Sequence, residues 1–374
     1  MHGAGEMISR RTFGQRSLSQ AGLVAMASMA ATGVSLADDA SRIRWEVFSG
    51  TGSSDSPSAD QPSDPLEIAM RNPYGIEVTP NWIYFSTVDD HSIWQLSRKQ
   101  GTIRRFAGTG KQGYSGDGGP ALSATFNAPH EIRADSRGNL FVADTRNHCI
   151  RRIDAKTGVV ITLAGNGKPG YGGDNIIATQ ARFNQPHSIV LDPTGCIVAD
   201  TLNHRVRRID LRSGLVRNLA GTGRGALPTS HRTANLQPVF GPRSLAIGPK
   251  SIWLVLREGN SIWRIDRLTG KIVHLAGTGE KGFRGDGGDP LEAEFRGPKG
   301  IALDSQQRVL IADTENHAIR RIDQRKNLVE LLQTPYRLKR PHGVAVIPAG
   351  SAVDMTQDTY LVSDSENHQV LSGV

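Results

Sequence analysis

A twelve-residue stretch that recurs along the chain constrains the fold more than any other feature. The sequence ADTRNHCIRRID at 143–154 returns as ADTLNHRVRRID at 199–210 and as ADTENHAIRRID at 312–323. Three weaker copies follow the same pattern, at 86–97, 255–266 and 362–373. Internal self-similarity of this kind is typical of arrays in which each repeat forms one small structural unit. We therefore expect six copies of one unit.

A proline marks the start of each unit. Four short runs rich in β-branched and aromatic residues follow each proline, bounded by Gly, Asn or Asp, as in a four-stranded antiparallel sheet. Such a sheet cannot bury both of its faces alone, so the units should pack radially as a propeller. The spacings are 56, 57, 56, 56 and 43 residues, between Pro73, Pro129, Pro186, Pro242, Pro298 and Pro341.

The two ends of the repeat array complement each other. The last unit stops after its third run, QVLSGV at 369–374, whereas IRWEVFSGTG at 43–52 resembles a fourth strand without a unit. We expect segment 41–72 to supply this strand and a loop, which closes the ring and removes exposed sheet edges. The prediction is an all-β fold, a single six-bladed β-propeller domain over 41–374, as a monomer.

Residues 1–37 have the layout of an export signal. Paired arginines at 10–11 precede an apolar run that ends in Ser-Leu-Ala at 35–37, with small residues at positions −3 and −1 of a cut. The arginine pair resembles a twin-arginine signal. We expect export to the periplasm or the cell exterior, with an uncleaved anchor as the alternative. No later run approaches the ~18 apolar residues that span a bilayer, so the mature chain should have no transmembrane span.

The repeated motifs resemble NHL repeats. The resemblance rests on P-x-G-I-A-x-D, ADTxNHxIRRID and LAGTGxxGYxGDGGPA, and it covers nearly all of 41–374. It implies a six-bladed propeller but no particular function, because propellers serve as binding modules and as enzymes. The Asn-His pairs that carry the resemblance stand at 147–148, 203–204, 316–317 and 367–368.

Most repeated polar residues point to structural roles. Asp and Asn-His at a tight turn suit backbone capping. One Asp repeats in each Gly-rich loop (Asp117, Asp174, Asp286), which is too few ligands for calcium, so these loops should let the chain cross between blades. Cys149 and Cys196 could pair, but Cys149 is replaced in every other unit, which favours a packing thiol.

The charge is mildly basic. The formal net charge is +8, and three Arg with one Glu lie within 1–37, which leaves +6 for the remainder. This bias is compatible with anionic partners. The arginines of the RRID motif recur as one pair to a unit and should be spread around the ring, and no base-stacking aromatics accompany them. We therefore expect no nucleic-acid partner.

The column directly after each proline contains the candidate functional site. The run after the proline should be the innermost strand, so these side chains should ring one mouth of the central channel, with Glu131 beside them. A basic funnel of this kind attracts anions, and His130, His187 and His342 could instead hold a metal as neutral imidazoles. No other cofactor is expected. The column reads Tyr74, His130, His187, Arg243, Lys299 and His342.

Two functions remain open. The first is a binding scaffold for a protein, peptide or glycan ligand at the loop face or channel mouth, favoured because the sequence shows no composite catalytic set. The alternative is a metal-assisted lyase or hydrolase at the channel mouth, similar to peptidyl-hydroxyglycine or streptogramin lyases. There a cation would polarise the substrate while a His or Tyr moves a proton.

Overall fold

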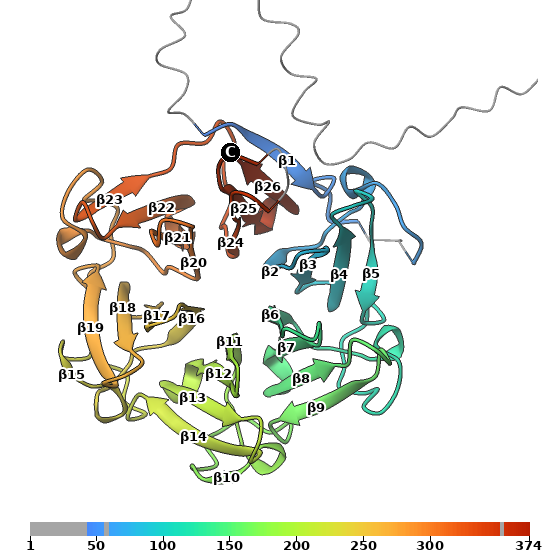
Figure 1. The fold of residues 1–374 in the computed structure, drawn as a ribbon, viewed down its shortest axis with the longest axis horizontal. Coiled ribbons are helices and arrows are strands. Elements are labelled where there is room, and N and C mark those ends of the chain that lie inside the picture. The colour runs from blue at the N-terminus through green and yellow to red at the C-terminus, as the bar shows by residue number, and fades with distance from the viewer. Residues whose placement is uncertain (1–42, 56–59, 352–354) are drawn as a thin grey trace, which may run out of the picture.

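Six antiparallel sheets stand around a central axis in the computed structural model (Figure 1). The structure describes residues 43–55, 60–351 and 355–374, so the predicted export signal at 1–37 lies outside the described residues. The chain visits the blades in order, and within each blade it runs from the innermost strand outward, except that the outer strands β1, β10 and β15 precede the rest of their blades. The predicted six-bladed, all-β propeller is confirmed.

The blades have the following strands, from the axis outward. Blade 1 contains β2 (Pro73–Val78), β3 (Trp82–Thr87), β4 (Ser92–Ser97) and β5 (Ile103–Ala107). Blade 2 contains β6 (Pro129–Ala134), β7 (Leu140–Asp144), β8 (Cys149–Ile153) and β9 (Val160–Ala164). Blade 3 contains β11 (Pro186–Asp192), β12 (Gly195–Asp200), β13 (Arg205–Asp210), β14 (Leu215–Ala220) and the short β10 (Ile176–Ile177).

Blades 4 to 6 repeat this plan. Blade 4 contains β16 (Pro242–Ile247), β17 (Ser251–Leu256), β18 (Ser261–Asp266), β19 (Lys271–Ala276) and the short β15 (Arg232–Thr233). Blade 5 contains β20 (Gly300–Leu303), β21 (Val309–Asp313), β22 (Ala318–Asp323) and β23 (Leu328–Leu331). Blade 6 contains β24 (Val344–Ile347), β25 (Thr359–Asp364), β26 (Gln369–Gly373) and, from the other end of the chain, β1 (Trp45–Ser49).

The ring closes through the N-terminal strand. β1 pairs antiparallel with β26, with Trp45 opposite Gly373 and Val47 opposite Leu371 (Figure 1). The prediction that the segment before Pro73 completes the last blade is therefore confirmed. Because the first and last strands share one sheet, opening the ring would break this ladder.

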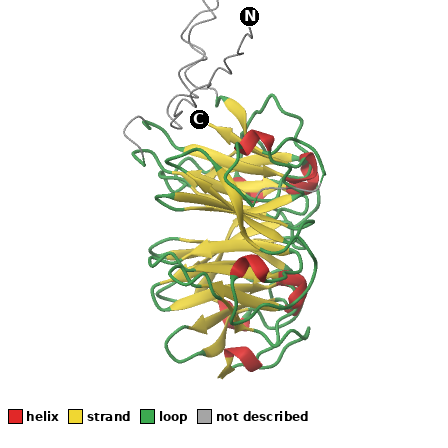
Figure 2. Cartoon of the chain, turned by 90° about the vertical axis from the view of Figure 1, so that its right-hand side faces the viewer, coloured by secondary structure: helices red, strands yellow, loops and turns green. Residues whose placement is uncertain are grey.

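The core is divided into layers between neighbouring blades. One layer, for example, packs Phe141 and Ile150 of blade 2 against Ile189 and Val198 of blade 3, all of them buried. Helical structure in the described residues is limited to single 3-10 turns, and none of these is long and apolar enough to cross a bilayer. Figure 2 shows the stacked strands edge-on with these short turns at the surface.

Candidate axial site

The six post-proline side chains meet at one end of the channel, as predicted. Tyr74 stacks on His342 with ring centroids 3.8 Å apart. His130 stands edge-on to both Tyr74 and His187, with centroids 4.7 Å apart in each case. Lys299 Nζ lies 3.0 Å from His342 Nε2. All six, together with Glu131, line one cavity with a free volume of about 30 Å³.

Two buried cations dominate the charge of this axial ring. Arg243 is 7% exposed, and its Nη1 has no hydrogen-bond partner among the described residues. Burial lowers the pKa of Arg243 to about 10. Burial and the neighbouring Arg243 lower the pKa of Lys299 to about 7, although Glu315 lies 3.3 Å from its Nζ. The ring therefore carries positive charge that the surrounding protein compensates only in part.

Burial disfavours the charged form of two ring histidines, His130 and His342. Burial lowers the pKa of His130 and of His342 well below the usual range, with Arg243 adding to the effect at His130 and Lys299 at His342. The Nδ1 atoms of both rings lie 2.8 Å from backbone carbonyls, of Ala128 and Arg340, which assigns the proton to Nδ1. Each Nε2 is then an acceptor, and that of His342 receives its hydrogen bond from Lys299.

The three histidines proposed as possible metal ligands have other contacts. His342 Nε2 faces the Lys299 ammonium, and Nδ1 of His187 lies 2.8 Å from Thr201 Oγ1. Over the described ranges, no three His, Cys, Asp or Glu side chains are grouped as a metal site. The donors and the positive charge of the ring come from Arg243 and Lys299, which both line the cavity.

Acidic side chains lie deeper along the same axis. Glu131 forms an ion pair with Arg133, which also lies 3.8 Å from Glu77. Burial raises the pKa of Glu77 to about 7 and also raises that of Glu131. Beyond this trio the channel is lined mainly by apolar side chains, including Val190 and Ile301. The channel is therefore asymmetric, with its basic ring at the proline end of the innermost strands.

The repeated histidines join successive blades. Nδ1 of His148 accepts a hydrogen bond from the backbone N–H of Gln185, directly before the marker proline of the next blade. Asn260 Oδ1 does the same for Gly297. The prediction of backbone capping is correct, but the capped amide belongs to the neighbouring blade. The other caps are His91 to Ala128, His204 to Gly241, His317 to Arg340 and His368 to Asn72.

The first arginine of each RRID motif is an internal ion-pair partner. Arg151 is fully buried between Asp144, 3.5 Å away, and Asp117 of the Gly-rich loop, 2.8 Å away. Its guanidinium also lies over the Phe126 ring, 5.1 Å from the centroid. Arg207 and Arg320 repeat the arrangement with Asp174 and Asp286. These arginines hold the Gly-rich loops against their blades.

Comparison with known proteins identifies the repeat. The family described as NHL repeat matches residues 126–153 and 295–322. The chain carries NHL repeats. These NHL units contain the inter-blade histidine and the buried arginine, so the repeated polar residues maintain the propeller. The axial column differs from blade to blade, and the scaffold does not dictate it.

The relatives of this NHL propeller with similar sequences match it over only part of their own length. The chain is 27% identical over 266 residues to Protein SUPPRESSOR OF QUENCHING 1, chloroplastic, of Arabidopsis thaliana, covering 66% of this chain and 24% of that protein. It is 25% identical over 278 residues to human NHL repeat-containing protein 2, covering 65% of this chain and 38% of that protein. The chain thus corresponds to well under half the length of these relatives.

Solved structures share the propeller fold. An auxiliary nutrient binding protein from Bacteroides thetaiotaomicron superposes with a TM-score of 0.61 at 12% identity, covering 89% of this chain and 77% of that one. A streptogramin B lyase superposes with a TM-score of 0.51 at 16% identity, covering 89% and 97%. At these identities the likeness concerns the fold alone.

Sequence reasoning missed the arginine–aspartate pairs of the NHL units, although a signal was present. The three units with Arg at this position are the three whose Gly-rich loop contains a Gly-Asp dipeptide. The other units have Trp94, Trp263 or Leu371 at that position. The two cysteines, for which pairing was left open, are free and buried.

Proposed function

We propose that the chain is a binding scaffold that holds an acidic group of a protein, peptide or glycan ligand at the axial mouth. Arg243 carries this proposal, because its side chain lines the cavity and its buried Nη1 has no hydrogen-bond partner among the described residues. A buried donor without an acceptor is costly, and an incoming carboxylate would satisfy it. Lys299 adds a second donor beside the same cavity.

The size of the cavity favours a ligand that remains mostly outside. Its volume of about 30 Å³ is only about two to three times the ~10–15 Å³ that a cavity needs to hold one water molecule. Small-molecule sites usually enclose some 300–1,000 Å³. A single carboxylate tip is therefore the largest group we expect to enter, with the rest of the ligand on the surrounding loops. The same volume counts against the lyase alternative, which needs room for the reacting part of its substrate.

The test uses two acidic polymers as probes. Poly-L-glutamate and polygalacturonate represent an acidic peptide and an acidic glycan, and calorimetry at low salt measures their binding. Because hydrogen bonds to charged groups contribute about 1.5–3 kcal/mol, Arg243→Met should weaken the binding of an active probe by at least ~10-fold. Arg212→Met, which removes an exposed arginine outside the axial ring, is the matched control.

Three results would contradict the proposal. They are equal affinity of wild type and Arg243→Met, equal loss with Arg212→Met, and binding of neither probe. Lys299→Met should also weaken binding, because it removes the second cation of the ring.

We further propose export of the chain by the twin-arginine route, on the basis of the residue pattern at 1–37. Changing the arginine pair at 10–11 to lysines should retain the chain in the cytoplasmic fraction. Wild-type protein found only in the cytoplasm would refute the proposal.

A further inference from the structure

In five blades the outermost strand is covered by the connection that leads into that blade. β10 pairs with β14 and β15 pairs with β19, both antiparallel. Loops take this role in the other three blades. Ser63 and Ile103 exchange two backbone hydrogen bonds, and the N–H groups of Val160 and Val329 donate to the carbonyls of Gly119 and Gly288. The cover removes the exposed edge of each sheet, the usual site of unwanted pairing.

The sixth connection is too short to provide such a cover. It spans 332–343 between β23 and β24, about half the length of 108–128 between β5 and β6, as the 43-residue spacing of the last two prolines requires. Within the described ranges, no backbone hydrogen bond covers the outer edge of β1. β1 lies on the rim of the propeller (Figure 1).

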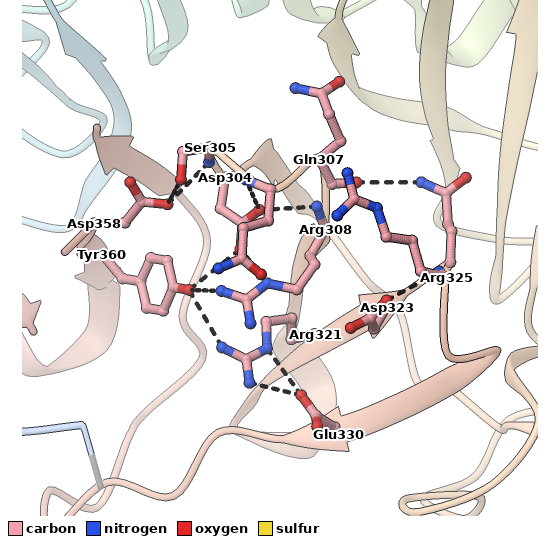
Figure 3. A network of polar contacts seen from close by, with 12 residues as sticks. Asp304, Ser305, Gln307, Arg308, Arg321, Asp323, Arg325, Glu330, Asp358 and Tyr360 are labelled. Carbon is pink, nitrogen blue, oxygen red and sulfur yellow. Dashed lines mark hydrogen bonds and ion pairs between the residues drawn. The ribbon is translucent and has the colours of Figure 1, made fainter. Parts of the chain in front are cut away.

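A groove accompanies this open edge. It has a volume of about 1110 Å³ and is lined by Ile43, Val374 and the stretch 331–335. Figure 3 shows part of its lining, where Tyr360 of blade 6 accepts hydrogen bonds from Arg308 and Arg321 of blade 5. Arg321 in turn bonds Glu330 at 2.7 Å. Side-chain hydrogen bonds thus join blades 5 and 6 at this groove, where the connection between the blades does not cover the outermost strand.

The register of β1 shows which groups face outward. Arg44 and Val374 exchange two backbone hydrogen bonds, of 2.8 and 3.0 Å, so their pairing is of the hydrogen-bonded type. In an antiparallel ladder this type alternates, so Glu46 also bonds toward β26. The backbone N–H and C=O groups of Ile43, Trp45 and Val47 therefore point away from β26.

We propose that this edge pairs antiparallel with β1 of a second copy of the chain, about a two-fold axis at Trp45. Ile43 then faces Val47 of the second copy, and Trp45 faces its counterpart. Arg44 faces Glu46 of the second copy on the exposed side of the strand, twice by symmetry. The stretch IRWEV is chemically self-complementary in this register alone, and opposite charges in cross-strand positions favour pairing.

Arg44 can serve this contact in addition to those within its own chain, since a guanidinium has five N–H donors. Glu46 is exposed, whereas Ile43, Trp45 and Val47 are half-buried. A ladder of five residues is a small interface, so the dimer should be weak and concentration-dependent. This proposal differs from the monomer expected from the sequence, and it is independent of the axial site.

Sedimentation velocity of the full chain over a wide concentration range tests the proposal. Glu46→Lys and Arg44→Glu each place like charges opposite one another at two symmetric positions, and each should raise the dissociation constant by ~10-fold or more. The double variant Arg44→Glu/Glu46→Lys exchanges the charges and should restore pairing. Glu280→Lys, an exposed charge reversal before blade 5, is the control.

Several outcomes would overturn the proposal. A chain that stays monomeric at all concentrations would do so, as would a dimer indifferent to both single substitutions, which would use another surface. A double variant no better than the singles would exclude the register. Slow amide exchange at Trp45 and Val47 in dilute monomer would show that a different segment covers the edge.

Discussion

Replacing Lys299 with Met should stabilise the protein more at pH 6 than at pH 9. Lys299 is 8% exposed, and its pKa falls from 10.5 to about 7 through burial and the nearby Arg243. Between about pH 7 and 10.5 the unfolded chain binds a proton that the folded chain does not, so this lysine's contribution to stability rises with pH across that window. Below about pH 7 the folded lysine is charged, and the full free-energy cost of burying this charge is present.

The magnitude follows from the two pKa values. Each pKa unit is worth 1.36 kcal/mol, so the cost at low pH is about 5 kcal/mol. At pH 9 most of the proton has left the folded lysine, and about 2 kcal/mol remains. Methionine removes the charge at both pH values. The stabilisation by Lys299→Met should therefore be about 2 to 3 kcal/mol greater at pH 6 than at pH 9.

Urea unfolding of wild type and variant at both pH values measures this difference. Losses of stability that do not depend on pH cancel in the difference between the two pH values. One of them is the loss of the hydrogen bond that Lys299 donates to His342 Nε2. Glu315 keeps an ion pair with Arg340 at 2.7 Å. Glu77 also titrates near neutral pH, but it does so in both proteins. Lys271→Met, at an exposed position, should show no such pH dependence. A variant whose effect is the same at both pH values would refute the assignment of Lys299 as a buried cation.

Three further predictions concern the scaffold. Arg151→Met should lose about 3 kcal/mol of unfolding free energy because it leaves the buried Asp144 without its cation. Arg152→Met, which removes a side chain that is 33% exposed, should lose under about 1 kcal/mol. Equal losses of the two variants in urea unfolding would contradict this prediction. His148→Asn should be tolerated, since Asn260 makes the same hydrogen bond between blades. His148→Ala should lower the free energy of unfolding by about 1 kcal/mol. An alanine variant more stable than the asparagine variant in thermal unfolding would be inconsistent with this role of His148. Burial raises the pKa of the Cys149 and Cys196 thiols, so Ellman's reagent should label them only on unfolding, and rapid labelling of native protein would disprove this.

The sequence by itself determined the architecture of this protein. Its period of about 56 residues specified the blades, and turn residues between short β-rich runs specified four strands in each. The missing fourth strand of the last unit required β1 to close the ring. The axial column was also predictable, because residues at one register of a repeat occupy equivalent places around a ring, as Tyr74, His130 and Lys299 do.

Only the tertiary structure decided what these residues contact. Arg151 and Asp117 lie 34 residues apart in the chain, and His148 caps an amide 37 residues later in the next blade. The unpaired Nη1 of Arg243 and the 30 Å³ cavity that this residue lines depend on how six inner strands converge. The open edge of β1 arises because β1 pairs with β26 along its other edge. Local patterns encode strands and turns, whereas the twist and packing of neighbouring sheets set these distances.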